Sequence, residues 1–231
     1  MQLIRLSPRL ATVARYVPKH SYLLDVGSDH AYLPISLVQH HVIDHGIVSE
    51  VARGPYQNMV TDLKQQRLIK VLKPKLADGL AAIGRQNPVT AITISGMGGP
   101  LIKHILDRGK AKLSNRPRLI LQPNVDSRVV RQWLTKHHYR ISHEQMVADR
   151  HRIYEVMVAD WTCQSVHYTR QQLTFGPKLL QSKGPVFNRK WRAEANHLQS
   201  IINQIKQSQN RRSITRIKIL RKRIQLIKKV L

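Results

Sequence analysis

The chain has 231 residues, 42% of them apolar, so it can bury the core of one full domain and a smaller second one. Its net charge of +26 favours a polyanionic partner, nucleic acid first and a membrane surface second. No apolar run of about eighteen residues predicts a membrane span, the first residues lack a signal-peptide pattern, and the single Cys163 excludes an internal disulfide or a zinc cluster. We expect a cytoplasmic protein without membrane association or a bound metal.

The first predicted helix begins at Pro8, because Ser7 is a suitable N-cap and proline suits the first helical position. Apolar residues then recur at helical spacing up to Val17, and Pro18 ends the pattern. This amphipathic helix is expected to cover a sheet.

Residues 22–34 read Y-L-L-D-V-G-S-D-H-A-Y-L-P, which predicts a buried strand, a tight turn and a helix. Ligands of open parallel sheets bind at the carboxyl ends of strands, and Gly27 would let a ligand approach the backbone closely. The turn is bracketed by Asp25 and Asp29 and lacks the G-x-G-x-x-G pattern of dinucleotide sites. It therefore suits a ligand without phosphates, such as S-adenosylmethionine, although an ordinary strand-to-helix turn is an equal alternative.

The second and third predicted strands, residues 46–51 and about 73–77, end beside Glu50 and Asp78. A carboxylate at the position of Glu50 can accept hydrogen bonds from both ribose hydroxyls of a nucleoside. A carboxylate at the position of Asp78 can accept a hydrogen bond from the amino group of adenine. Single acids at strand ends are often only solvated. Three in series, counting Asp29, favour a nucleoside-containing cofactor.

The fourth predicted strand, residues 91–95, runs into G-M-G-G, where three glycines indicate close approach of another group or a packing turn. The fifth, residues 118–121, ends in Gln122-Pro123-Asn124, whose two amides could read the edge of a base. The last two strands, about 139–147 and 153–159, have a link too short for a parallel crossover and predict an antiparallel hairpin. The expected fold class is α/β, a Rossmann-like, seven-stranded and mostly parallel sheet with helices on both faces, as in class I methyltransferases.

The tail of the chain differs in composition, since residues 161–231 hold sixteen Lys or Arg and one acid, Glu194. We therefore predict two domains, residues 1–160 and 161–231. Heptad spacing, interrupted across residues 207–213, predicts two antiparallel helices of a C-terminal α-helical coiled-coil domain, with a seam formed by Trp191, Ala195, Leu198, Ile202, Ile205, Ile217, Leu220, Ile224, Ile227 and Leu231. Their basic outer faces, with Arg211, Arg212 and Arg216, are predicted to bind RNA, and the alternative is a solvated coiled coil that dimerises.

Seven segments in chain order closely resemble the bacterial tRNA adenine-N1 methyltransferases that modify adenine 22 in the D-arm. They are D-V-G-S-D-H-A-Y-L-P (25–34), S-E-V-A-R-G-P (49–55), A-D-G-L (77–80), I-S-G-M-G-G (94–99), L-I-L-Q-P-N (119–124), I-Y-E-V (153–156) and F-G-P-K-L-L (175–180). The resemblance implies a class I methyltransferase domain followed by a coiled-coil domain, with S-adenosylmethionine as cofactor and tRNA as substrate. Two departures, Ala77 for the more usual Gly and Ser95 for the more usual Ala, remove no functional group. We expect a monomer.

Carried over by position, the resemblance implies a set of site residues. The cofactor would be bound by Gly27, Ser28, His30, Glu50, Val51, Asp78, Gly79, Gly96 and Met97. The substrate base would be held by Tyr32, Gln122 and Asn124, although packing is an equal role for His30 and Tyr32. Asp29 is the predicted catalytic carboxylate, since an acceptor for the adenine amino group would stabilise the cation that develops during transfer; its alternative role is to bind the amino group of the cofactor.

Three other functions remain open on the sequence. A methyltransferase acting on the amino group of adenine, or on another RNA adenine, would share the fold, but such enzymes commonly have an N-P-P-Y-like turn where this chain has G-M-G-G. A non-catalytic RNA-binding protein on this fold would leave Asp29, Glu50 and Asp78 without a role. A basic coiled-coil module for a membrane or a protein partner would not explain the first 160 residues.

Overall fold

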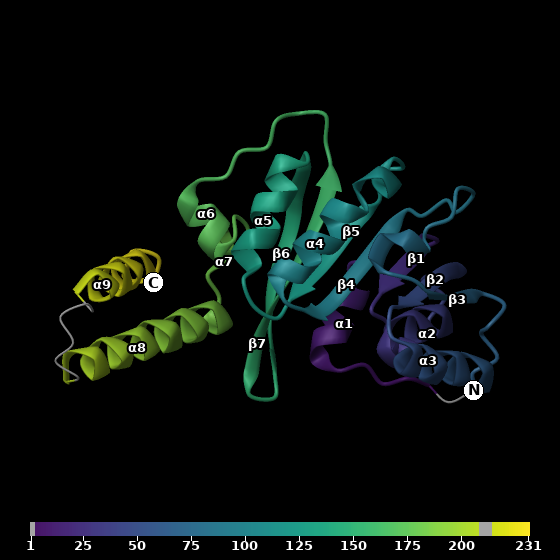
Figure 1. The fold of residues 1–231 in the computed structure, drawn as a ribbon, viewed down its shortest axis with the longest axis horizontal. Coiled ribbons are helices and arrows are strands. Elements are labelled where there is room, and N and C mark those ends of the chain that lie inside the picture. The colour runs from purple at the N-terminus through teal and green to yellow at the C-terminus, as the bar shows by residue number, and fades with distance from the viewer. Residues whose placement is uncertain (1–2, 208–213) are drawn as a thin grey trace.

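The computed structural model describes residues 3–207 and 214–231. Within these residues the strands form a seven-stranded sheet of order β3-β2-β1-β4-β5-β7-β6 (Figure 1). The strands are β1 (Tyr22–Val26), β2 (His45–Glu50), β3 (Leu72–Leu76), β4 (Ala91–Met97), β5 (Arg118–Pro123), β6 (Tyr139–Asp149) and β7 (Arg152–Trp161). The predicted number of strands and the Rossmann-like fold class are confirmed.

The first five strands are parallel, whereas β7 runs antiparallel to β5 and β6 runs antiparallel to β7. The final hairpin is therefore the antiparallel one that the short link predicted. Its two strands are longer than expected, since the ladder continues to the pair Asp149 and Arg152. The chain order reverses between β1 and β4, so the carboxyl ends of these two strands form the switch point where open α/β sheets bind ligands.

Helices cover both faces of the sheet. One face packs against α1 (Pro8–Ala14), α2 (Tyr32–Gln39) and α3 (Arg53–Gln65), and the other against α4 (Gly99–Arg108) and α5 (Ser127–Lys136). Short helices η1 (Asp29–Ala31), η2 (Gly79–Ala82) and η3 (Lys110–Leu113) complete this part. The predicted N-cap is present, because the Ser7 hydroxyl accepts a bond from the Leu10 amide at 3.4 Å.

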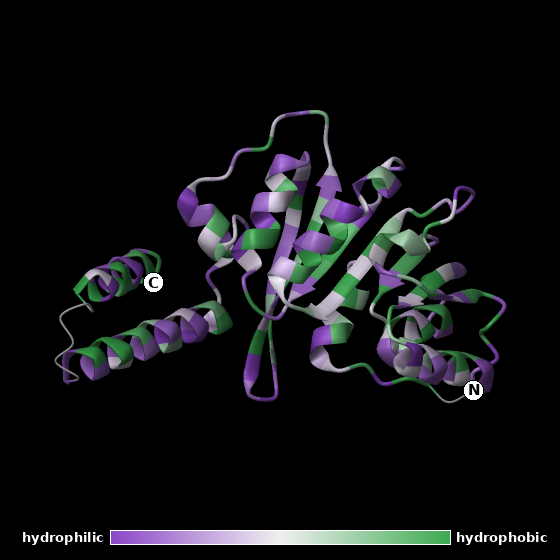
Figure 2. Cartoon of the chain, in the orientation of Figure 1, coloured by the Kyte–Doolittle hydropathy of each residue, from purple (hydrophilic) through white to green (hydrophobic). Residues whose placement is uncertain are grey.

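Alternate residues of each central strand enter the two cores. In β1, for example, Leu23 packs with α1 to α3 while Leu24 packs with α4 and α5, and both are fully buried. This two-sided burial explains why the central strands β1, β4 and β5 are mainly apolar (Figure 2).

The C-terminal part contains α6 (Arg170–Phe175), α7 (Leu179–Ser182), α8 (Pro185–Gln207) and α9 (Ile214–Lys228). The helices α8 and α9, here called the helical hairpin, pack antiparallel, because Ile227 near the end of α9 clusters with Phe187 and Trp191 at the start of α8 (Figure 1). The cluster also contains Met146 of β6, which joins the helical hairpin to the sheet.

The prediction that Leu231 belongs to the seam of the helical hairpin is wrong. Leu231 is 40% exposed, while Val230 is 1% exposed and packs in the seam. The helix ends at Lys228, so heptad spacing no longer decides which side chain points inward.

Arg211 and Arg212 lie outside the described residues. No helix in the described part of the chain is both long enough and apolar enough to cross a membrane.

Candidate active site

The turn after β1 is held against β2 and covered by β4. The amides of Gly27 and Ser28 donate to the Ser49 carbonyl at 2.9 and 3.1 Å. Gly27 has a φ of 69°, and a Cβ added there would lie 2.2 Å from Cε of Met97. The backbone conformation therefore favours glycine at this position, and a Cβ there would require the end of the flexible Met97 side chain to move.

A buried carboxylate lies beneath this turn. Asp25 accepts hydrogen bonds from the Ser28 and Thr93 hydroxyls, each at 2.5 Å. Burial raises the pKa of Asp25 to about 6, although the two hydroxyl bonds act in the opposite direction. Asp25 therefore links the turn to β4, while its side chain stays inside the protein.

A cavity of about 400 Å³ opens at the carboxyl ends of β1 and β4. Its lining includes Gly27 and Ser28 of the turn, Asp29, Tyr32 and Gly96. The Asp29 side chain is 68% exposed, and its one contact in the described chain is His30 Nε2 at 3.6 Å. The structure thus brings together five residues that the sequence assigned to the cofactor, the catalytic step and the substrate.

His30 is next to this cavity in the chain but is not among its lining residues. Its Nδ1 atom lies 2.7 Å from Asp62 Oδ2 on α3, and its ring stacks on Tyr32 with 5.2 Å between centroids. His30 and Ala31 have φ values of 56° and 51°, a conformation that costs about 1–3 kcal/mol per residue and persists where the surroundings fix it. His30 therefore packs within the protein in this structure, and its role at the cofactor or the base stays a prediction.

Gln122 and Asn124 lie at the end of β5, but their amides bind within the protein. Gln122 is fully buried; its Oε1 accepts from the Gly96 amide at 3.0 Å and from Arg9 Nη1 at 2.6 Å, and its Nε2 donates to Asn124 Oδ1 at 3.0 Å. Asn124 Nδ2 donates to the Gly96 carbonyl at 2.7 Å. Gln122 therefore cannot contact a base in this arrangement, whereas Asn124 is exposed and has one amide hydrogen left.

Arg9 is the site residue that the sequence reasoning missed. Its guanidinium binds Gln122 and lines the cavity. Nothing local in the sequence distinguishes Arg9 from the other basic residues, because its partner is 113 positions away. The segment L-S-P-R supplies the one useful signal, since its cap fixes where α1 begins and therefore where Arg9 points.

The acids after β2 and β3 lie outside this cavity lining. Glu50 Oε1 accepts the amides of Val51 and Ala52 at 2.8 and 3.2 Å, and Val51 is an exposed apolar side chain beside it. Asp78 Oδ2 is bound by Arg108 Nη1 at 2.6 Å in a separate cavity of about 160 Å³. Glu50 Oε2 and Asp78 Oδ1 are the oxygens left for a ligand.

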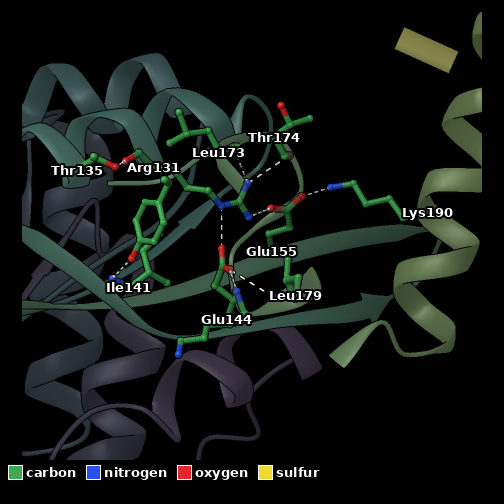
Figure 3. Close-up of polar contacts among 11 residues, drawn as sticks. Arg131, Thr135, Ile141, Glu144, Glu155, Leu173, Thr174, Leu179 and Lys190 are labelled. Atoms are coloured by element: carbon green, nitrogen blue, oxygen red, sulfur yellow. Dashed lines mark hydrogen bonds and ion pairs between the residues drawn. The ribbon is translucent and has the colours of Figure 1, made fainter. Parts of the chain in front are cut away.

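A buried ionic network joins the sheet to the C-terminal helices (Figure 3). Arg131 of α5 lies between two carboxylates, with Nε 2.7 Å from Glu144 Oε1 and Nη2 2.5 Å from Glu155 Oε2. Lys190 of α8 binds the other oxygen of Glu155, and the Lys178 amide donates to Glu144 Oε2 at 2.9 Å. The network fixes the position of the helical hairpin on the sheet. Arg216 lies on the helical hairpin, in α9, and is exposed.

The strand order and the cavity over Gly27 define a methyltransferase of class I. The model of the family described as tRNA (adenine(22)-N(1))-methyltransferase matches residues 23–229. The chain belongs to this family.

Individual relatives agree over the full length. The tRNA (adenine(22)-N(1))-methyltransferase of Bacillus subtilis is 38% identical over 236 residues, covering 100% of this chain and 99% of the relative. A solved structure of a Listeria monocytogenes protein has a TM-score of 0.95 at 36% identity, covering 98% of this chain and 99% of its own. Streptococcus pneumoniae Sp1610, solved in complex with S-adenosyl-L-methionine, has a TM-score of 0.89 at 39% identity, covering 98% and 100%.

Proposed function

We propose that this protein transfers the methyl group of S-adenosylmethionine to N1 of adenine 22 of tRNA. The observation that carries the proposal is the open cavity over Gly27, at the switch point of a chain that matches this family over nearly its full length. The net charge of +26 suits a polyanionic substrate.

The residues at the rim fit this cofactor. Ser95, which lines the cavity, has a buried hydroxyl oxygen without a partner in the described residues, as expected where a polar ligand binds. Arg9 supplies a cation for the carboxylate of the methionine part. Gly27, Ser28 and Gly96 form the walls on that side, with Met97 packed close to Gly27 and His30 beside Tyr32.

The adenosine part of the cofactor would lie along the ends of β2 and β3. Glu50 Oε2 would accept from a ribose hydroxyl, with Val51 packing on the adenine. Asp78 Oδ1 would accept the adenine amino group beside Gly79, while Arg108 keeps Oδ2. Substitution of Glu50 by Gln should weaken cofactor binding in calorimetric titration without loss of fold.

S-adenosylmethionine supplies a methyl group activated by the sulfonium. The nitrogen N1 of adenine is largely unprotonated at neutral pH, so the protein needs no strong base. Asp29, at the mouth of the cavity, accepts a hydrogen bond from the adenine amino group and stabilises the positive charge that the purine gains. Tyr32 and Asn124 hold the base, and Gln122 acts through Arg9 and Asn124 by fixing their positions.

Asp29→Asn separates the two roles of this carboxylate. If Asp29 serves the target base, kcat falls by about 100-fold while the Kd for S-adenosylmethionine changes little. If it binds the cofactor amino group, the Kd rises instead. Asp44→Asn, an exposed acid elsewhere in the chain, is the matched control and should leave both values unchanged.

The substrate adenine must leave its stacked position, because N1 lies on the Watson–Crick edge. We propose that residues 161–231 form a second domain that grips the tRNA body through Arg211, Arg212, Arg216 and neighbouring Lys and Arg residues. Truncation near residue 160 would remove Lys190 from Glu155, so a triple variant is the sharper test. Replacement of the exposed residues Arg216, Lys218 and Lys222 by Gln should raise the KM for tRNA.

The decisive experiment incubates the pure protein with labelled cofactor and an unmodified tRNA transcript, then maps methylated adenine by mass spectrometry. A transcript with guanine at position 22 is the control. Alkali rearranges N1-methyladenine to the N6 product, so the shift identifies the methylated atom. Methylation at another atom or position, or none at all, would contradict the proposal, and sedimentation of the same sample tests whether the protein is a monomer.

A further inference from the structure

We propose that the turn between β6 and β7 binds the phosphodiester backbone of the RNA strand next to the target adenine, through Arg150 and Arg152. The inference rests on the proposed function and adds a second binding site to it.

The turn lies at the same edge of the sheet as the active site. β7 runs antiparallel to β5, pairing Leu121 with Met157 and Leu119 with Ala159, so the start of β7 lies beyond the carboxyl end of β5. The ladder continues to Asp149 and Arg152, which leaves a two-residue link. Figure 1 shows the hairpin projecting past the sheet beside α1, and the link is hydrophilic in Figure 2. A fully paired hairpin presents its turn residues with little freedom, which favours a preformed site.

A cavity of about 460 Å³ lies between this turn and the start of α1. Its lining includes Arg150, His151, Arg152 and Tyr154 from the hairpin, and Arg9 from α1. Arg9 also lines the cavity over Gly27, so one side chain lies between the two cavities. The guanidinium carbon of Arg9 is 5.4 Å from the centroid of the Tyr154 ring, which helps to hold it there.

The charge of this cavity is suited to an anion. In the described part of the chain, Arg150 and Arg152 are exposed and have no acidic partner. The one acid of the lining, Asp149, accepts the backbone amide of Arg9 at 3.4 Å. Arginine binds phosphate oxygens in a bidentate manner, and two unpaired arginines on a rigid turn form a suitable phosphate site.

The covalent bonds of the substrate strand identify the anion that the cavity at the turn binds. A base placed at the mouth of the cavity over Gly27 remains joined to its own 5′ and 3′ phosphates, which must lie next to that cavity. The cavity at the turn adjoins it through Arg9. The backbone of the substrate strand is therefore the polyanion that must pass this point.

The first test compares the double variant Arg150→Gln, Arg152→Gln with Lys64→Gln, Lys70→Gln, which removes the same charge from exposed positions near the opposite edge of the sheet. We expect the KM for tRNA to rise about tenfold in the first variant and the slope of log K against log salt to fall by about one or two. The Kd for the cofactor and the thermal midpoint should match those of the wild type. An equal rise of KM in both variants, or in neither, would overturn the proposal.

The second test locates the contact by phosphate ethylation interference on tRNA. With the wild type, ethylation of phosphates within about two nucleotides of adenine 22 should block binding, and with the arginine double variant that interference should disappear. Loss of interference at distant phosphates would overturn the inference. The wild type's own methylation of tRNA is measured alongside, so absence of activity refutes the proposed function, whereas normal activity with unchanged interference refutes only this site.

Discussion

Replacement of Glu155 by Gln probes the network that holds the helical hairpin on the sheet. Both oxygens of this buried carboxylate are bound by cations, Arg131 on one side and Lys190 on the other. Burial alone would raise the pKa of Glu155, but the two cations outweigh it and lower the pKa from 4.5 to about 2. The amide keeps the shape of the side chain and removes the charge, so among the described residues Arg131 retains Glu144 as its only carboxylate partner.

The size of the effect follows from this pKa. A difference of roughly 2.5 units corresponds to about 3 kcal/mol, and loss of one partner of a buried ion pair typically costs about 3–5 kcal/mol. For a chain of this length, 3 kcal/mol lowers the thermal midpoint by about 6–12 °C. The pKa of Glu155 is lower in the folded state, so its contribution is present above pH 4.5 and is lost as the pH falls towards 2.

The assay is urea unfolding at pH 7 and along a series towards pH 3. Glu194→Gln is the matched control, because Glu194 pairs with Arg223 while both side chains are 31% exposed, and such pairs contribute about 0–1 kcal/mol. Glu155→Gln should lose about 3 kcal/mol at pH 7 and show a weaker acid dependence than the wild type. Equal losses in the two variants, or an unchanged acid dependence, would refute the reasoning.

Three further predictions concern the rim of the sheet. Asp25→Asn should not lower the free energy of unfolding measured in urea at pH 7. The pKa of Asp25 is raised to about 6 in the folded protein, so its contribution to stability is full below pH 3.8 and is lost as the pH rises through 6. The variant should lack this pH dependence. Gly27→Ala should lose cofactor binding in calorimetric titration and about 1–2 kcal/mol of stability, because alanine is strained at a φ of 69° and its Cβ would displace the end of the Met97 side chain; binding at wild-type affinity would contradict this. Gln122→Met should reduce methylation at least about tenfold at unchanged substrate concentrations, because it leaves Arg9 and the Gly96 amide unpaired, and full activity would show that Arg9 needs no such anchor.

The strands could be predicted because their signal is local, whereas their order in the sheet was expected only through the Rossmann-like fold class. Apolar runs such as that ending at Val26 form strands buried on both faces, and the link after β6 is too short for anything but a hairpin. The turn at Gly27 could likewise be predicted, since strand, glycine and acid are adjacent in the chain. Of the predicted seam, Trp191, Ala195, Ile202, Ile224 and Ile227 are buried, whereas Val230 takes the place of Leu231 where α9 has ended.

The candidate site could be predicted only in part, because polar side chains choose their partners in three dimensions. Gln122 looked like a reader of bases, yet Arg9 and Gly96 use its carbonyl oxygen. Asp78 looked like a free acceptor, yet Arg108 from α4 binds one of its oxygens. Contacts over these sequence separations leave no periodic trace, so residue type and strand position identify the rim and leave its hydrogen bonds undetermined.

The strand β7 has a consequence for how far apart two contacts can be. Arg152 begins this strand, and Glu155, which anchors α8 through Lys190, follows three residues later, a separation of roughly 10 Å along an extended chain. A strand of the central sheet thus connects the start of the helical hairpin to the basic turn. If the helical hairpin and the turn both contact the tRNA, the strand keeps the distance between these two contacts fixed. The sheet itself then determines how far the reacting base lies from the body of the tRNA.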